Sequence, residues 1–593
     1  MKSAFSTIAT ILGNPVYWES PYRAHTSEQM ATLRQLGFNT IFVNLAWSRP
    51  WMDVVTLEQL HVGTSYPWLS DTNALAAAQA TVRQRLDGVV AAGLRPFFLF
   101  GCPAQIDLTA LTAEQLTLTE LLCGVRTSRI APRVSIACIR SPQLRQHYRE
   151  LLHSHFARFP ETAGLLIYTV DELAEVCDEL DDCPRCQNLP LHERLPEFLA
   201  FLRQVIDEIN PSIELWWEPW EFTTAQTYAV VGRLDPRIKL SVHTGIHEVY
   251  YVNRPDLWLR HLCRLAADRG IEVIVEGFFS GTGEDLGPLP AYPCPRLVYE
   301  QLRSISELPS VVGIKEYFGT VAEHLSVNDR ALQGYLQQPN ASDTTIIGEV
   351  AQRFGDTASA PLLQAWEAAS RAVESFPWDL SWRLRHYNSV RYDQGFGGQG
   401  VGGQYWARDF VASLPTPWTT PSWESSRYAA YIVAANACAV GVRLLLETDQ
   451  RLQQTLSHVD TALHHLAALP MLSEDNALRQ DLQRQIDSLV LFRHLTLARS
   501  YHLQASQLAA TLRGDPSPAV TDDSPDKLAE CLRADLANAE ALYALVNQRG
   551  YRGFDLPPFA HTIQQMHAEI AAYQHDPLQW VRIHFVPAGQ IPL

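Results

Sequence analysis

Cysteine is scarce in this chain, with ten residues among 593. Cysteines this sparse cannot form the disulfide scaffold that stabilises small secreted domains, so we expect reduced thiols and a cytoplasmic protein. The N-terminus carries one lysine and a short apolar run that is broken by Gly13, Asn14 and Pro15. This pattern predicts a first strand and not a secretory signal.

Positive charge is also in short supply. The chain has 47 Lys and Arg against 64 Asp and Glu, for a formal net charge of -17. Such a surface on average repels phosphate, which argues against nucleic acid and membranes as partners. No uninterrupted apolar run approaches the length of a membrane-spanning helix. The hydrophobic content of 47% indicates large cores, and the length predicts roughly two to four domains.

A nucleotide-binding G-x-G-x-x-G motif does not follow the first predicted strand, although short apolar runs alternate with helical patterns. Eight such strands predict a parallel (β/α)₈ TIM barrel, with an open doubly wound sheet as the alternative. Gly37 and Gly270 each end a helix just before a strand, as C-cap glycines do. The eight predicted strands are residues 7–13, 39–45, 95–101, 164–170, 213–219, 238–245, 271–277 and 311–319.

The strand signals stop after residue 320, and long helical patterns follow. We expect a catalytic barrel over residues 1–325 and a helical extension with a glycine-rich segment over 326–410. Residues 411–593 are then an α-helical C-terminal domain. Its helices are also a candidate surface for homo-oligomer formation.

Acidic residues follow several predicted strands, at the end where barrel enzymes build their active sites. Asp171 and Glu172 follow the fourth strand, and Glu218, Glu276 and Glu316 lie near the C-terminal ends of the fifth, seventh and eighth. Cleavage of a glycosidic bond needs two carboxyl groups, so this convergence predicts a glycoside hydrolase acting on a carbohydrate. Any single strand-end acid can instead form a salt bridge or anchor a loop. The further candidates for substrate contacts are Asn14, Trp47, Trp216, Glu218, His243, Glu316 and Tyr317.

The run ACIRSPQLRQHYRELLHSHFARFPETAGLLIYTVDE, at 137–172, resembles retaining clan A barrel glycosidases, especially family 42 β-galactosidases. The resemblance implies that Glu172 is the acid/base and that Glu276, after the seventh strand, is the nucleophile. It also implies a structural zinc ion, with Cys138 as the upstream ligand. The cluster region of that family is occupied here by Cys177, Cys183 and Cys186. No organic cofactor is expected.

Position 171 departs from that family, because Asp stands where Asn is expected. An Asp-Glu pair is instead similar to family 20 β-hexosaminidases, in which the Asp steers the 2-acetamido group of the substrate to attack. The helices after the barrel are similar to family 20-like hydrolases and family 67 α-glucuronidases. Three hypotheses therefore stand: a retaining glycosidase, a substrate-assisted N-acetylhexosaminidase, and a barrel that binds carbohydrate without cleaving it.

The C-x₅-C-x₂-C spacing of the cysteine cluster has a chemical interpretation of its own. Three thiolates with a fourth from another loop suit tetrahedral zinc with no open position, so such a site is structural. Free buried cysteines are the alternative. Cys102, Cys123 and Cys294 are substitutes for Cys138 as the fourth ligand.

Overall fold

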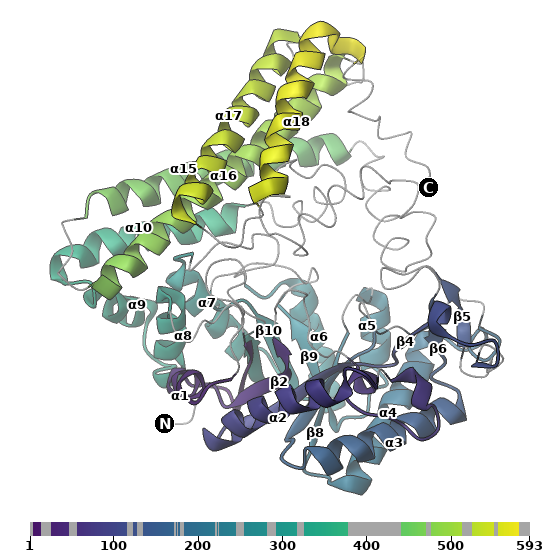
Figure 1. Cartoon of the computed structure of the whole chain (residues 1–593). Coiled ribbons are helices and arrows are strands. Elements are labelled where there is room, and N and C mark those ends of the chain that lie inside the picture. The colour runs from purple at the N-terminus through teal and green to yellow at the C-terminus, as the bar shows by residue number, and fades with distance from the viewer. Residues whose placement is uncertain are drawn as a thin grey trace.

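The computed structural model describes residues 4–12, 25–46, 56–70, 72–115, 122–126, 134–170, 174, 176–177, 183–219, 222, 224–244, 254–280, 292–316, 325–376, 440–469, 476–512, 525–550 and 556–579. Eight parallel strands close into a barrel in the order β1-β11-β10-β9-β8-β7-β3-β2 (Figure 1). Because β1 pairs with both β2 and β11, the (β/α)₈ prediction is confirmed and the open sheet is excluded. The barrel strands are β1 (Thr7–Leu12), β2 (Thr40–Ala46), β3 (Arg95–Gly101), β7 (Gly164–Tyr168), β8 (Glu214–Glu218), β9 (Ile238–His243), β10 (Val273–Gly277) and β11 (Val311–Glu316).

A ring of helices surrounds the barrel, and local signals set the ends of several of them. Gly37 and Gly270 end α1 and α6 with φ angles of 109° and 70°, so both predicted C-caps are confirmed. The last of the ring, α8, packs against α7 and α1, so we assign it to the barrel although the predicted boundary is residue 325. The ring consists of α1 (Ser27–Leu36), α2 (Leu75–Ala91), α3 (Pro142–Arg158), α4 (Leu191–Ile209), α5 (Thr224–Val231), α6 (Leu257–Arg269), α7 (Pro295–Ser306) and α8 (Val327–Gln337).

A small antiparallel sheet, absent from the sequence prediction, is inserted between β3 and α3. Its strands lie in the order β4-β6-β5 and are too short to show clear alternation. The insertion brings Cys123 on β5 close to Cys138, which follows β6. The inserted strands are β4 (Gln105–Asp107), β5 (Leu122–Arg126) and β6 (Val134–Ala137), and the short 3₁₀ turns nearby are η1 (Leu57–Gln59), η2 (Pro67–Leu69) and η3 (Leu108–Ala110).

Apolar side chains fill the barrel lumen below its polar end. Trp216 packs against Phe97, with ring centroids 4.6 Å apart, and Phe42 meets the same indole edge-on at 6.1 Å. Trp217, the next residue on β8, belongs to the separate outer core between the sheet and the helices. Strand alternation thus places the two neighbouring tryptophans on opposite faces of β8.

Helices make up the rest of the described chain, which confirms the predicted helical C-terminal region. In Figure 1 the last four helices form a long bundle at one end of the barrel, above α10. α10 packs along α15, and the indole N–H of Trp366 on α10 donates to Gln485 on α16 at 2.8 Å. The predicted glycine-rich segment at 394–406 lies outside the described residues. These helices are α9 (Asp343–Gln352), α10 (Asp356–Ser375), α15 (Val440–Ala467), α16 (Asn476–Leu512), α17 (Pro525–Arg549) and α18 (Leu556–His575).

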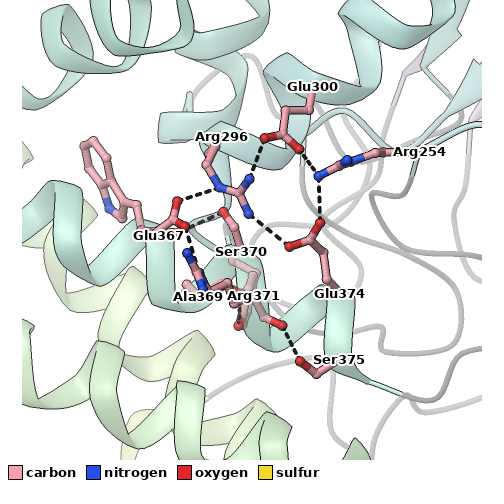
Figure 2. Close-up of polar contacts among 11 residues, drawn as sticks. Arg254, Arg296, Glu300, Glu367, Ala369, Ser370, Arg371, Glu374 and Ser375 are labelled. Carbon is pink, nitrogen blue, oxygen red and sulfur yellow. Dashed lines mark hydrogen bonds and ion pairs between the residues drawn. The ribbon is translucent and has the colours of Figure 1, made fainter.

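An ion-pair network joins α10 to the barrel, as Figure 2 shows. Arg296 on α7 contacts Glu367 at 2.6 Å and Glu374 at 2.9 Å, both on α10, and also pairs with Glu300. Arg254, which precedes α6, pairs with Glu300 and with Glu374 at 3.0 Å. Two arginines therefore hold three glutamates at the junction between the barrel and α10. Among the described helices, none combines the length and apolar character that membrane crossing requires.

Candidate active site

Four polar side chains from consecutive strands meet in the barrel lumen at the C-terminal end of the sheet. Glu276 on β10 is in register with His243 on β9 and with Lys315 on β11. In-register residues on parallel strands point to the same face, which places these three together. Glu218 ends β8, two residues after Trp216, and completes the group one layer above the apolar lumen.

The contacts among these four residues form a closed circuit. Lys315 Nζ lies 2.7 Å from Glu218 Oε2 and also forms an ion pair with Glu276 Oε2. His243 Nδ1 lies 2.9 Å from Glu276 Oε1, and its Nε2 lies 3.2 Å from Glu218 Oε1. The Ser241 hydroxyl donates to Glu218 at 3.2 Å. Each carboxylate therefore faces both the ammonium and the imidazole.

These four side chains are buried, so the charge of each carboxylate is stabilised mainly by its neighbours in the group and little by water. Glu276 and Lys315 have no exposed surface, whereas Glu218 is 4% and His243 8% exposed. Burial acts to raise the pKa of Glu218, but the Lys315 charge and the His243 hydrogen bond outweigh it and hold that pKa at about 2. Burial lowers the pKa of Lys315, and Glu218 opposes this effect. The Lys315 ammonium also lies 5.7 Å from the centroid of the Phe42 ring.

The same carboxylates and imidazole have a geometry that suits a cation. One ligand atom from each of Glu218, His243 and Glu276 lies within 4.8 Å of the others. The Lys315 ammonium contacts both carboxylates and already supplies a positive charge between them. We therefore interpret the group as an ion-paired carboxylate site rather than as a metal centre.

Glu316, a predicted substrate contact, has a different position. Strand alternation turns it away from Lys315, and the Phe279 N–H and the Ser280 hydroxyl donate to its carboxylate at 2.7 and 2.5 Å. Burial raises the pKa of Glu316 to about 8, against the effect of the Ser280 hydrogen bond. Glu316 thus anchors the segment that follows Glu276, and we assign it to loop anchoring and not to substrate contact.

The other predicted site residues divide into two groups. Trp216 is fully buried between Phe42 and Phe97, so its ring offers no face to a sugar and we assign it to barrel packing. The remaining predicted residues lie outside the part of the chain that the structure describes, and their roles stay predictions: Asn14, Trp47, Asp171, Glu172 and Tyr317.

Five buried cysteines form a second cluster beside the barrel. Sulfurs of Cys123, Cys138, Cys183 and Cys186 lie within 4.8 Å of one another. The Cys138 sulfur is 3.9 Å from that of Cys183 and 3.7 Å from that of Cys186. A tetrahedron of sulfurs about 2.3 Å from a zinc ion has edges of about 3.8 Å, so these spacings fit a metal.

The fifth thiol, Cys177, has a different partner. The Arg194 guanidinium donates to its sulfur at 3.0 Å and to its carbonyl at 2.8 Å. Hydrogen bonding from Cys123 lowers the pKa of Cys177 to about 4, and the nearby Arg194 charge acts in the same direction. Arg185 donates to Cys138 at 3.4 Å. The two arginines thus place positive charge beside the thiolates that a metal requires.

Sequence reasoning missed two members of these sites. Lys315 was not among the predicted residues, although a lysine inside an otherwise apolar strand is unusual and signals a buried partner. The sequence offers Cys123 only as a substitute for Cys138, whereas the structure places both sulfurs in the same cluster. Cys102 and Cys294, the other two substitutes, are buried but belong to the main core and not to the cysteine cluster.

Comparisons with known proteins identify the fold but no family. No family model and no curated protein matches the sequence. The structure is similar to that of a family 138 glycoside hydrolase that targets the pectin rhamnogalacturonan II, with a TM-score of 0.56 and 10% identity over 98% of this chain and 68% of that one.

Two further solved structures are similar with lower TM-scores. One is a variant of the Thermobaculum terrenum O-GlcNAc hydrolase, with a TM-score of 0.37 and 11% identity over 97% of this chain and 98% of that one. The other is CpGH84D, with a TM-score of 0.39 and 11% identity over 96% and 76%. These neighbours are glycoside hydrolases of several families, and at such identities the likeness shows the fold alone. The family 42 resemblance stays a prediction.

Proposed function

We propose that the protein is a glycoside hydrolase that cleaves its substrate by a retaining mechanism, with Glu276 as nucleophile and Glu172 as acid/base. The observation that supports this proposal most directly is the Glu276 carboxylate at the end of the seventh barrel strand, which contacts both Lys315 and His243. A nucleophilic carboxylate must be ionised, and an adjacent ammonium stabilises that form.

The proposed reaction has two steps. In the first, a Glu276 oxygen bonds to the anomeric carbon while the bond to the leaving oxygen breaks, and Glu172 gives its proton to that oxygen. In the second, Glu172 takes a proton from water, whose oxygen displaces Glu276 and releases the sugar. A retaining pair requires the two carboxyl groups about 5 to 5.5 Å apart, whereas about 6.5 to 9.5 Å corresponds to inversion.

One observation favours a second candidate, substrate-assisted cleavage by Asp171 and Glu172. Glu276 has no exposed surface, and both of its oxygens face a cationic or hydrogen-bonding partner. A carboxylate fixed in this way also suits a structural role. The 2-acetamido group of the substrate would then attack the anomeric carbon in place of Glu276. The two candidates differ in whether that acetamide is needed.

A panel of nitrophenyl glycosides tests the proposal. It should hold hexosides, N-acetylhexosaminides and hexuronides, the last because the structurally similar family 138 enzyme targets a pectin. On an accepted hexoside we expect Glu276→Ala to lose turnover and sodium azide to restore it with a glycosyl azide as product. Hydrolysis confined to the acetamido sugars would favour the second candidate. Sugar binding without hydrolysis by any member would favour a non-catalytic barrel.

We also propose that the cysteine cluster holds a structural zinc ion. Four thiolates would complete its coordination, so the ion would stabilise the fold and take no part in the reaction. The sulfur spacing supports Cys123, Cys138, Cys183 and Cys186 as the ligands. Cys177, which was a predicted ligand, would then be an outer thiolate held by Arg194.

A further inference from the structure

We propose that Lys315 is a positioning residue of the active site, which holds the Glu276 carboxylate ionised and oriented by sharing its ammonium between Glu276 and Glu218. This inference rests on the proposed retaining function and adds to it a residue outside the sequence prediction. The ammonium belongs to a fully buried side chain, so water contributes little to its solvation. Its charge is therefore balanced by the two carboxylates that it contacts.

The backbone determines which side chain faces the carboxylate. Lys315 is the in-register neighbour of Glu276 on β11, and Glu316, one residue later, turns to the loop behind the strand. The ammonium reaches across to Glu218 on β8 at 2.7 Å, above the Phe42 ring. A side chain that connects three strands in this way has little freedom to move, so it fixes the direction of both carboxylates.

The charge balance suggests what Lys315 does during turnover. Among the described residues, the titratable groups that contact Glu276 are Lys315 and His243. Both of them also contact Glu218. When Glu276 becomes an ester its charge is lost, and Lys315 remains paired with Glu218. When the ester breaks, the ammonium stabilises the returning carboxylate. Without Lys315, two buried carboxylates would face each other, and at least one of them would bind a proton.

The main test compares Lys315→Met with Lys315→Arg on the best nitrophenyl glycoside. For Lys315→Met we expect kcat/KM at pH 6 to fall at least 100-fold. The acidic limb of the plot of kcat/KM against pH should move up by at least one pH unit. Lys315→Arg should keep the limb near its wild-type position because the positive charge remains. The matched control is Lys239→Met, which removes the barrel lysine that pairs with Glu214 and Glu272. A folded Lys315→Met protein with the wild-type limb would overturn the inference.

A second measurement needs no substrate. A double-mutant cycle of Lys315→Met and Glu276→Gln, followed by urea unfolding at pH 7, should show that the two losses of stability are not additive. Additive losses would overturn the proposed pairing. If the losses are coupled but the wild-type protein hydrolyses no glycoside on the panel, the proposed function fails. The proposed role of Lys315 in catalysis then fails as well, whereas its ion pair with Glu276 is still supported.

Discussion

His243 Nδ1 lies 2.9 Å from Oε1 of Glu276, its in-register neighbour on the next strand, while the other ring nitrogen lies 3.2 Å from Glu218. The ring therefore bridges two carboxylates that come from strands on either side of it. Each ring nitrogen therefore faces one carboxylate oxygen, and His243 fixes the separation of Glu276 and Glu218 from the side opposite Lys315.

Replacing His243 with Gln should lower kcat/KM on an accepted nitrophenyl glycoside on the order of 100-fold, as loss of one preorganised donor does in other active sites. The glutamine amide has a single nitrogen, so it cannot place one nitrogen against each carboxylate as the ring does. The matched control is His153→Gln, because His153 is exposed on α3. Equal activities of the two variants would contradict the role of His243.

The Glu316 carboxyl should make the protein less stable as pH rises. Its pKa of about 8 in the folded state lies above the ordinary value of 4.5, so the folded protein retains a proton that the unfolded chain has released. The stability that the protonated Glu316 carboxyl gives to the folded state is complete below about pH 4.5 and is lost as pH rises to about 8. Glu316→Gln resembles the protonated form, and its urea midpoint should fall less between pH 5 and 8.

The control for this measurement is Glu307→Gln, on an exposed side chain at the end of α7. It should follow the wild-type dependence of the urea midpoint on pH. If Glu316→Gln shows the wild-type dependence as well, then the buried carboxyl does not bind a proton in this range.

Purified protein should contain about one zinc ion per chain, held by four of the five clustered cysteines. Cys123→Ser should lose the metal, because it removes one of the four sulfurs with mutual tetrahedral spacing. Cys177→Ser should keep it, because the Cys177 sulfur is not one of those four and the Arg194 guanidinium already donates to it. Metal analysis, and the visible spectrum of the cobalt-substituted proteins, check both results. Retention by Cys123→Ser with loss by Cys177→Ser would restore the ligand set predicted from the sequence.

Removal of the zinc with a chelator should lower the melting temperature of the wild-type protein, since binding energy at a structural site is folding energy. The Cys123→Ser protein should not respond to the chelator. A wild-type melting temperature that is the same before and after complete removal would show that the ion does not stabilise the fold.

Arg296→Met should destabilise the junction between α7 and α10 by about 2 kcal/mol, between the values for exposed and buried ion pairs. The change leaves Glu300, Glu367 and Glu374 with less positive charge among them (Figure 2). Urea unfolding at low and high salt checks this, and high salt should reduce the loss. The control, Arg303→Met, removes an exposed pair with Glu307 on the same helix and should have little effect.

Local patterns were enough to predict most of the barrel. Short apolar runs and the helices between them predicted all eight strands, and Gly37 and Gly270 predicted two helix ends, because these features depend on neighbouring residues along the chain. The same reasoning placed Glu218 and Glu276 at strand ends. The inserted sheet was missed because β4 and β6 have only three and four residues, and Gly124 interrupts the apolar run of β5.

The sequence by itself determined that carboxylates end several barrel strands and that cysteines cluster after the fourth, since both are matters of spacing along the chain. Only the tertiary structure decided that Lys315, and not Glu316, faces the lumen, and that Cys123 joins Cys138 while Cys177 turns to Arg194. The reason is physical. A period of two distinguishes the faces of a strand, but barrel closure selects the face that points inward, and folding of the inserted sheet brings Cys123 to cysteines that lie later in the chain.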